Sequence, residues 1–207
     1  MIKEQGFWDW FIAHEAELYT FDPESEPERE RLFDNLETEL QRVHPKLTFA
    51  FGPRGDKRQF VISAAGLKSG FPSVVSLVDA APRLERWCVI AFRPRRPLPC
   101  VLEIAGVEVS SEDIQYSLLH NGKTVGIRLF IPGFQERDSN WQQIGYLFLD
   151  ETLGEFDVES KLGLITMYPP EAATHEKRYP LGELPHAFDT LVSRLAEKNR
   201  ATSENSK

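Results

Sequence analysis

Residues 114–134, IQYSLLHNGKTVGIRLFIPGF, decide the fold because their pattern predicts two strands joined by a turn. The Asn121-Gly122 dipeptide between apolar stretches is the strongest short-range hairpin signal in the chain. The next segment, SNWQQIGYLFLDETLG at 139–154, begins with capping-box spacing and is apolar around most of its circumference, which predicts a buried helix. KLGLITMYP at 161–169 reads as a strand covered on both faces. The order is strand, strand, helix, strand.

The same order occurs earlier in the chain. LTFAF at 47–51 alternates with a period of two, and RQFVISAA at 58–65 completes a second predicted hairpin. GFPSVVSLVDAAP at 70–82 predicts a helix, and WCVIAF at 87–92 predicts a central strand. The sequence therefore contains two possible ββαβ units in tandem, 47–93 and 114–168. Either a structural duplication or chance similarity explains the repeated order.

Helices are predicted to flank these units. GFWDWFIAHEAELY at 6–19 and the segment 25–44, with Ser25 and Glu28 at capping-box spacing, predict two N-terminal helices, and 186–199 predicts a C-terminal one. Residues 201–207 are polar and are expected to be a disordered tail. We expect one α+β domain over 1–200, with a mainly antiparallel sheet and helices packed on it.

Composition excludes several classes of function. Of the 207 residues, 24 are basic and 32 are acidic, and the net charge of −8 argues against a nucleic-acid partner because an acidic surface repels phosphate. No apolar run approaches the ~20 residues that span a bilayer, so no membrane association is expected. Cys88 and Cys100 form no CxxC pair, and a reducing, cytoplasmic location fits them, with Cys88 expected as a buried thiol.

One carboxylate in the first helix calls for a partner. On a helical wheel over 6–19, Glu15 falls inside the apolar arc between Trp8 and Phe11. A carboxylate in that position must be paired, hydrogen-bonded or protonated. It is not a dyad with His14, because adjacent side chains diverge on a helix. We expect an arginine to pair with Glu15, with a general acid or base as the alternative.

A charge contrast supplies the candidate arginines. Residues 83–97 hold five arginines and one glutamate, whereas 150–159 hold five acids and no base. A proline-stiffened loop after a predicted buried strand holds Arg93, Arg95 and Arg96. This arrangement suits an anion-binding site, because a guanidinium can donate two parallel hydrogen bonds to a carboxylate or phosphate. Three alternatives stay open: pairing with this chain's own acids, pairing with a second copy, or binding of a ligand or partner.

Arg128 is the charged residue inside the strand VGIRLFI, and it is expected on an open face or toward the acidic cluster. The sequence contains no nucleophile elbow, phosphate loop, dinucleotide fingerprint or zinc spacing. We therefore assign no catalytic residue, no metal ligand and no cofactor. The candidate binding residues are Arg93, Arg95, Arg96, Glu15 and Arg128.

The chain resembles an uncharacterised bacterial family assigned only a domain of unknown function, through the stretches AAPRLERWCVIAFRPRR (80–96) and GYLFLDETLGEFDVE (145–159). The resemblance spans most of 6–168, implies a bacterial cytoplasmic protein and carries no mechanism. We expect a non-catalytic protein with a regulatory or protein-interaction role, whose partner is a second copy of the chain or another protein. The alternative is an enzyme or small-anion-binding protein that uses the arginine cluster with a buried carboxylate.

Overall fold

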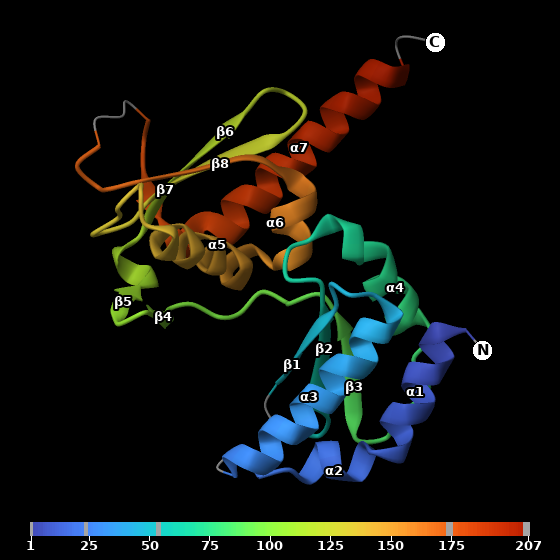
Figure 1. Ribbon diagram of the computed structural model, residues 1–207. Helices are drawn as coiled ribbons and strands as arrows, with labels where there is room; N and C mark the ends of the chain where they lie inside the picture. Colours follow the sequence, from blue (N-terminus) through green and yellow to red (C-terminus); the bar gives the residue numbers. More distant parts are fainter. Residues whose placement is uncertain (1, 23–24, 53–54, 173–175, 205–207) are drawn as a thin grey trace. The chain divides into compact units, whose positions relative to one another are not determined.

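The computed structural model describes residues 2–22, 25–52, 55–172 and 176–204 (Figure 1). It divides into two compact units, Met1–Arg93 and Pro94–Lys207. Each of the two ββαβ segments expected from the sequence lies within a different unit. The predicted α+β class is confirmed, and four of the six strand pairings among the described residues are antiparallel.

The first unit combines a three-stranded sheet, ordered β1-β2-β3, with four α-helices in its described part. β1 and β2 are antiparallel, whereas β2 and β3 are parallel. A short 3-10 turn at Lys68–Gly70 precedes α4. The elements are α1 (Lys3–Ala13), α2 (Glu15–Thr20), α3 (Glu26–Val43), β1 (Thr48–Phe51), β2 (Arg58–Ser63), α4 (Phe71–Asp79) and β3 (Trp87–Ala91).

The second unit begins with a small hairpin and continues with a four-stranded sheet ordered β8-β7-β6-β9. β6 is antiparallel to β7 and β9, and β7 is parallel to β8. The elements are β4 (Val101–Ile104), β5 (Val107–Ser110), β6 (Gln115–His120), β7 (Val125–Phe130), α5 (Ser139–Leu153), α6 (Glu155–Lys161), β8 (Leu162–Tyr168), β9 (Tyr179–Pro180) and α7 (Leu184–Glu204).

The two units share a topology in their central parts. In each, an antiparallel hairpin is followed by a helical segment, and the last strand lies parallel to the second strand of the hairpin. The middle strand is β2 in one unit and β7 in the other, and both are largely buried. The expected order of elements is thus present in both segments.

Aromatic side chains of the N-terminal helices form the core of the first unit. Phe7, Trp8 and Phe11 are buried against Phe60 of β2, and the Trp8 indole donates to the Leu77 carbonyl at 2.8 Å. The helix predicted over 6–19 is broken at His14 (φ −108°, ψ 6°), so α2 leaves the axis of α1 (Figure 1). The described residues before β1 therefore form three helices rather than two.

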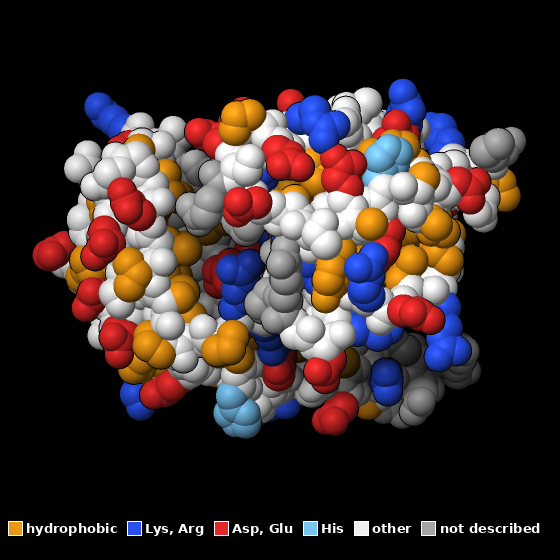
Figure 2. All heavy atoms as spheres, turned by 90° about the horizontal axis from the view of Figure 1, so that it is seen from below, with side chains coloured by type: hydrophobic (Ala, Val, Ile, Leu, Met, Phe, Trp, Pro, Cys, Tyr) orange, Lys and Arg blue, Asp and Glu red, His pale blue; other side chains and the backbone are white. Residues whose placement is uncertain are grey.

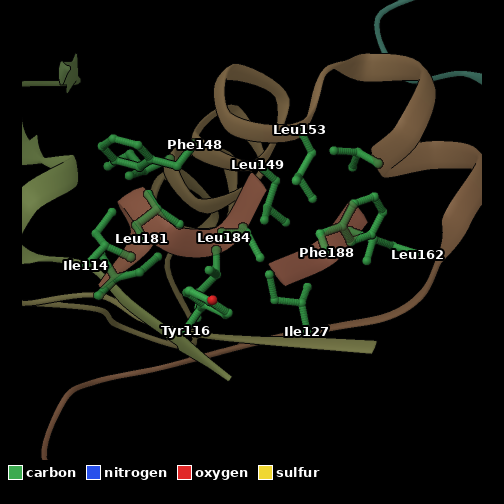
Figure 3. Close-up of a cluster of buried hydrophobic side chains, with 14 of the residues drawn as sticks. Ile114, Tyr116, Ile127, Phe148, Leu149, Leu153, Leu162, Leu181, Leu184 and Phe188 are labelled. Atoms are coloured by element: carbon green, nitrogen blue, oxygen red, sulfur yellow. The ribbon is translucent and has the colours of Figure 1, made fainter. Parts of the chain in front are cut away.

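The core of the second unit lies between its sheet and the helices α5 and α7. Tyr116 and Ile127 project from the strands toward Leu184 and Phe188 of α7, with Phe148 of α5 beside them (Figure 3). All five side chains are at most 2% exposed. Because alternate residues of a strand point to opposite faces, the other face of this sheet is formed by a different set of side chains.

Several local predictions need correction. Ser25 precedes α3 but makes no capping hydrogen bond with its side chain, and α5 is capped by Asp138, which accepts from the Asn140 amide, rather than by Ser139. The first cap is lost because Ser25 has φ −82° and ψ 85°, outside the usual extended capping geometry.

Other differences concern the ends of elements. A separate helix, α6, follows α5 after Gly154, whose φ of 80° requires the left-handed backbone region. α7 runs to Glu204, inside the segment expected to be a disordered tail, while 205–207 lie outside the described residues. Cys88 is exposed rather than buried, and β3, which was expected to be a central strand, lies at the edge of its sheet.

Candidate functional site

Arg95 forms hydrogen bonds with two acids and one backbone carbonyl of the second unit. Its Nη1 and Nη2 donate to the two oxygens of Asp189 at 2.8 Å, Nη2 also donates to Asp157 at 2.7 Å, and Nε donates to the Leu153 carbonyl at 2.9 Å. The pKa of Asp189 is lowered by the hydrogen bonds from Arg95, and the pKa of Arg95 is raised in turn. The guanidinium of Arg95 therefore already donates hydrogen bonds to oxygens of this chain, which disfavours Arg95 as a binding residue for an external anion.

Arg96 also pairs with the acidic segment 150–159. Its Nε lies 3.2 Å from a Glu151 carboxylate oxygen, and its backbone amide donates to the Glu151 carbonyl at 2.7 Å. Arg93 is half-buried and belongs to the first unit, whereas Arg95 and Arg96 belong to the second. Among the three alternatives, pairing with the chain's own acids is the arrangement present at Arg95 and Arg96.

Glu15 lies at the start of α2 and pairs with Arg86, the residue before β3. Arg86 donates from Nε at 3.0 Å and from Nη2, while the Trp87 indole donates to the same carboxylate at 2.7 Å. These hydrogen bonds, the one from Arg86 above all, lower the pKa of Glu15. The arginine expected for Glu15 is therefore present, but it precedes the strand WCVIAF instead of following it.

Sequence reasoning missed a second arginine in this region. Arg58 at the start of β2 is 6% exposed and donates to the carbonyls of Leu18 and Tyr19 at 3.1 and 3.2 Å. Its guanidinium lies 4.4 Å from the centre of the Phe21 ring. Arg58 thus pairs with carbonyls in the last turn of α2, where a helix has no further amides of its own to pair with them. Its position at the start of a buried strand was the signal in the sequence.

Arg128 lies on the face of the second unit's sheet that is opposite α5 and α7. In the strand register, Ser117 of β6 and Thr166 of β8 are its direct neighbours on either side. Directly paired residues point to the same face, so the three side chains form one polar row across three strands. Glu176, in the segment between β8 and β9, forms an ion pair with Arg128. Arg128 therefore lies on the sheet face away from the helices, and its partner Glu176 lies outside the acidic segment 150–159.

This polar row is incompletely satisfied. Buried side-chain atoms without a hydrogen-bond partner number five among the described residues, and four of them belong to this group: Ser117 Oγ, Arg128 Nε, Thr166 Oγ1 and Glu176 Oε2. Ser117 is only 2% exposed. Because nearly all buried polar atoms in folded proteins are paired, such a concentration marks a place where binding would add hydrogen bonds.

The free edge of the same sheet is the second notable feature. β8 pairs with β7 on one side, and no strand of the described chain pairs with its other side. A groove of ≈ 260 Å³ runs beside it, lined by Phe134, Gln142 and Tyr146 as well as by the strand. Leu164 on the strand is 52% exposed and Tyr146 is 44% exposed. β8 is thus an open edge strand rather than one covered on both faces, and the polar residues Glu136 and Gln142 lie beside its apolar side chains.

The remaining surface carries charges of both signs. Acidic and basic side chains are mixed over the centre and right of the face shown in Figure 2, and acidic ones predominate along its left margin. Within the described ranges, no group of three or more His, Cys, Asp or Glu side chains is placed to hold a metal ion. No described helix is long and apolar enough to cross a membrane.

Comparison with protein-family models, with curated proteins and with solved structures finds no match to this chain.

Proposed function

We propose that the protein has a non-catalytic, regulatory or protein-interaction role and that it acts as a homodimer joined along β8. The observation that carries this proposal is the free edge of that strand. β8, LGLITMY, is the longest described strand, at seven residues, and contains no charged residue and no proline. Such an edge presents unpaired backbone groups to any suitable strand, and proteins usually blunt it with lysine, proline or a short length.

The side chains beside the edge favour a strand as the occupant. Leu164 lies on the outer face of the sheet and Tyr146 lies on the helix-covered side. An added strand would cover both faces of the edge, because its side chains alternate between them. Strand addition of this kind gains affinity from main-chain hydrogen bonds and specificity from the flanking pockets.

A second copy of the chain is the occupant we propose. When β8 pairs with itself in antiparallel fashion about Ile165, Leu164 of each copy faces Thr166 of the other, and no charge faces a like charge within the strand. The contact is self-complementary, as a twofold interface requires. The net charge of −8 supports a protein partner over a nucleic acid.

The setting of the protein is part of the same proposal. Both cysteines are free thiols, which supports a reducing, cytoplasmic compartment. The bacterial origin rests on the resemblance of 80–96 and 145–159 to the uncharacterised family. The common topology of the two ββαβ segments supports an internal duplication.

The test is the solution mass of the full chain and of two matched variants. Leu164→Lys places a charge on the edge, whereas Leu67→Lys changes an equally accessible leucine, 45% exposed, in the first unit. Sedimentation equilibrium should give twice the chain mass of 23.7 kDa for the wild type and for Leu67→Lys, and one chain mass for Leu164→Lys. A monomeric wild type, or an equal mass for both variants, would overturn the proposal.

A further inference from the structure

We propose that the outer face of the second unit's sheet is a binding site for a small carboxylate with a short apolar chain, and that Glu176 occupies its polar end in the unliganded protein. The inference rests on other observations than the proposed dimer, although the site includes Leu164 and Thr166 of the same strand, β8. It rests on the polar row of Ser117, Arg128 and Thr166, on the position of Glu176, and on an apolar pocket beside them.

The polar row suits a carboxylate. An arginine between two hydroxyl groups offers one charged donor group and two neutral donors on one surface, which matches a planar, two-oxygen anion. Arg128 Nε, Ser117 Oγ and Thr166 Oγ1 are all buried and lack hydrogen-bond partners within the described chain. A bound carboxylate would pair atoms whose burial otherwise costs free energy.

Glu176 already places such a group at the site. One of its oxygens pairs with Arg128 Nη1, but the other is buried without a hydrogen bond. The segment that carries it is held by Arg178, which donates to the carbonyls of Pro170 and Ala172 at 2.6 and 2.7 Å and lies 3.7 Å from the centre of the Phe130 ring. Glu176 thus resembles a tethered ligand that fills the site imperfectly.

The apolar pocket lies one side-chain step along the same face. Leu119, Gly126 and Leu164 are direct neighbours in the register, each two residues from a member of the polar row. Two residues of a strand span about 6.6 Å. With residues of the adjoining hairpin loop, these three line a pocket of ≈ 230 Å³. A ligand with its carboxylate on Arg128 would place a chain of a few carbons here.

Gly126 forms the floor of this pocket. A Cβ built on it would meet the Cβ atoms of Leu164 and Leu119 at 3.4 and 3.5 Å, which is ordinary contact. The position therefore accepts a side chain without a clash, and a larger one would fill the pocket while leaving the polar row intact. This separates the two ends of the proposed ligand experimentally.

The test is calorimetric titration of the full chain with hexanoate, acetate, inorganic phosphate and hexanol. We expect hexanoate to bind more tightly than acetate, because only hexanoate fills the pocket, and phosphate and hexanol to bind weakly. Equal binding of phosphate and hexanoate would overturn the ligand class, and an absence of hexanoate binding by every form of the protein would overturn the site.

Three variants and a control complete the experiment. Glu176→Gln should bind hexanoate about tenfold more tightly, since an internal competitor reduces apparent affinity by the fraction of sites that it occupies. Glu171→Gln, an exposed acid of the same segment, should bind as the wild type does. Gly126→Val should bind hexanoate no better than acetate, and Arg128→Gln should lose both.

The result for Arg128→Gln counts only if its circular dichroism spectrum matches that of the wild type. If Arg128→Gln does not fold, Glu176→Gln and Gly126→Val still test the site. If Glu176→Gln binds no more tightly than Glu171→Gln, Glu176 does not occupy the site. If Gly126→Val retains the preference for hexanoate over acetate, the pocket does not hold the chain.

Discussion

The guanidinium of Arg95 and the carboxylate of Asp189 form a bidentate pair, with both N···O distances at 2.8 Å. Arg95 lies near the beginning of the second unit, and Asp189 lies on its last helix, α7. Asp157 of α6 and the Leu153 carbonyl at the end of α5 complete the arrangement. One side chain thereby joins the consecutive helices α5 and α6 to α7, through partners that lie 58 to 94 residues from Arg95 in the sequence.

Loss of this junction should destabilise the protein more than loss of the neighbouring pair. Arg95→Ala is expected to lower the free energy of unfolding by about 1 kcal/mol, since several partly exposed hydrogen bonds to charged groups are lost together. Arg96→Ala removes one ion pair whose arginine is 66% exposed, so a smaller loss is expected. Urea denaturation at pH 7 measures both, and equal losses would contradict the junction.

The contribution of Glu15 should depend on pH. Its pKa is lowered in the folded protein, chiefly by the hydrogen bond from Arg86. Glu15 therefore loses its carboxyl proton more readily in the folded state than in the unfolded state, where glutamate has a pKa of about 4.3. The resulting stabilisation is complete above that pH and is lost as the pH falls through the folded-state pKa.

A comparison of the wild type with Glu15→Gln tests this expectation. The glutamine variant should have a lower urea midpoint at pH 7, and the difference should shrink toward pH 3 as Glu15 is protonated. Glu17→Gln, which removes a more exposed ion pair with Arg31 from the same helix, serves as the control. A difference between wild type and Glu15→Gln that stays constant from pH 7 to pH 3 would contradict the assignment.

Phe188 should be among the most sensitive core positions of the second unit. It is fully buried between α7 and the sheet (Figure 3). Phe188→Ala is expected to cost about 3–5 kcal/mol, since the lost apolar burial is compounded by the cavity left behind. Val101→Ala, at a 57% exposed position of the same unit, should change the unfolding free energy little. Similar effects in chemical denaturation would show that the core is placed elsewhere.

Gly145 of α5 packs closely against Met167 of β8. A Cβ at this position would overlap the Sδ and Cε atoms of Met167 and approach Ile131 to 3.2 Å. Gly145→Val should therefore destabilise the protein by about 1–3 kcal/mol through overpacking. Because the main obstacle is one flexible side chain, Met167→Ala in the same chain should recover part of the loss. A double variant no more stable than Gly145→Val would place the overpacking elsewhere.

The sequence by itself determined the local architecture. The hairpin in 114–134 was predictable because its strands and its turn carry local signals, although the connection is a four-residue loop in which Asn121 Oδ1 accepts from the amides of Lys123 and Thr124. The α+β class and the repeated order of strands and helices follow from hydrophobic periodicity in the same way. The need of Glu15 for an arginine was also predictable, because burial of a carboxylate has a known cost.

Only the tertiary structure decided which partners meet. Arg86 and Arg93 stand at opposite ends of one strand, and nothing in their local sequence says which end lies next to α2. The pairs Arg95–Asp189 and Arg128–Glu176 join segments whose approach depends on how helices and strands pack. The polar row on the outer sheet face likewise arises from the register of three strands, which aligns Ser117, Arg128 and Thr166 although each is unremarkable in its own sequence. Periodicity is a local property of the chain, whereas strand register and helix docking are set by the packing of the whole unit.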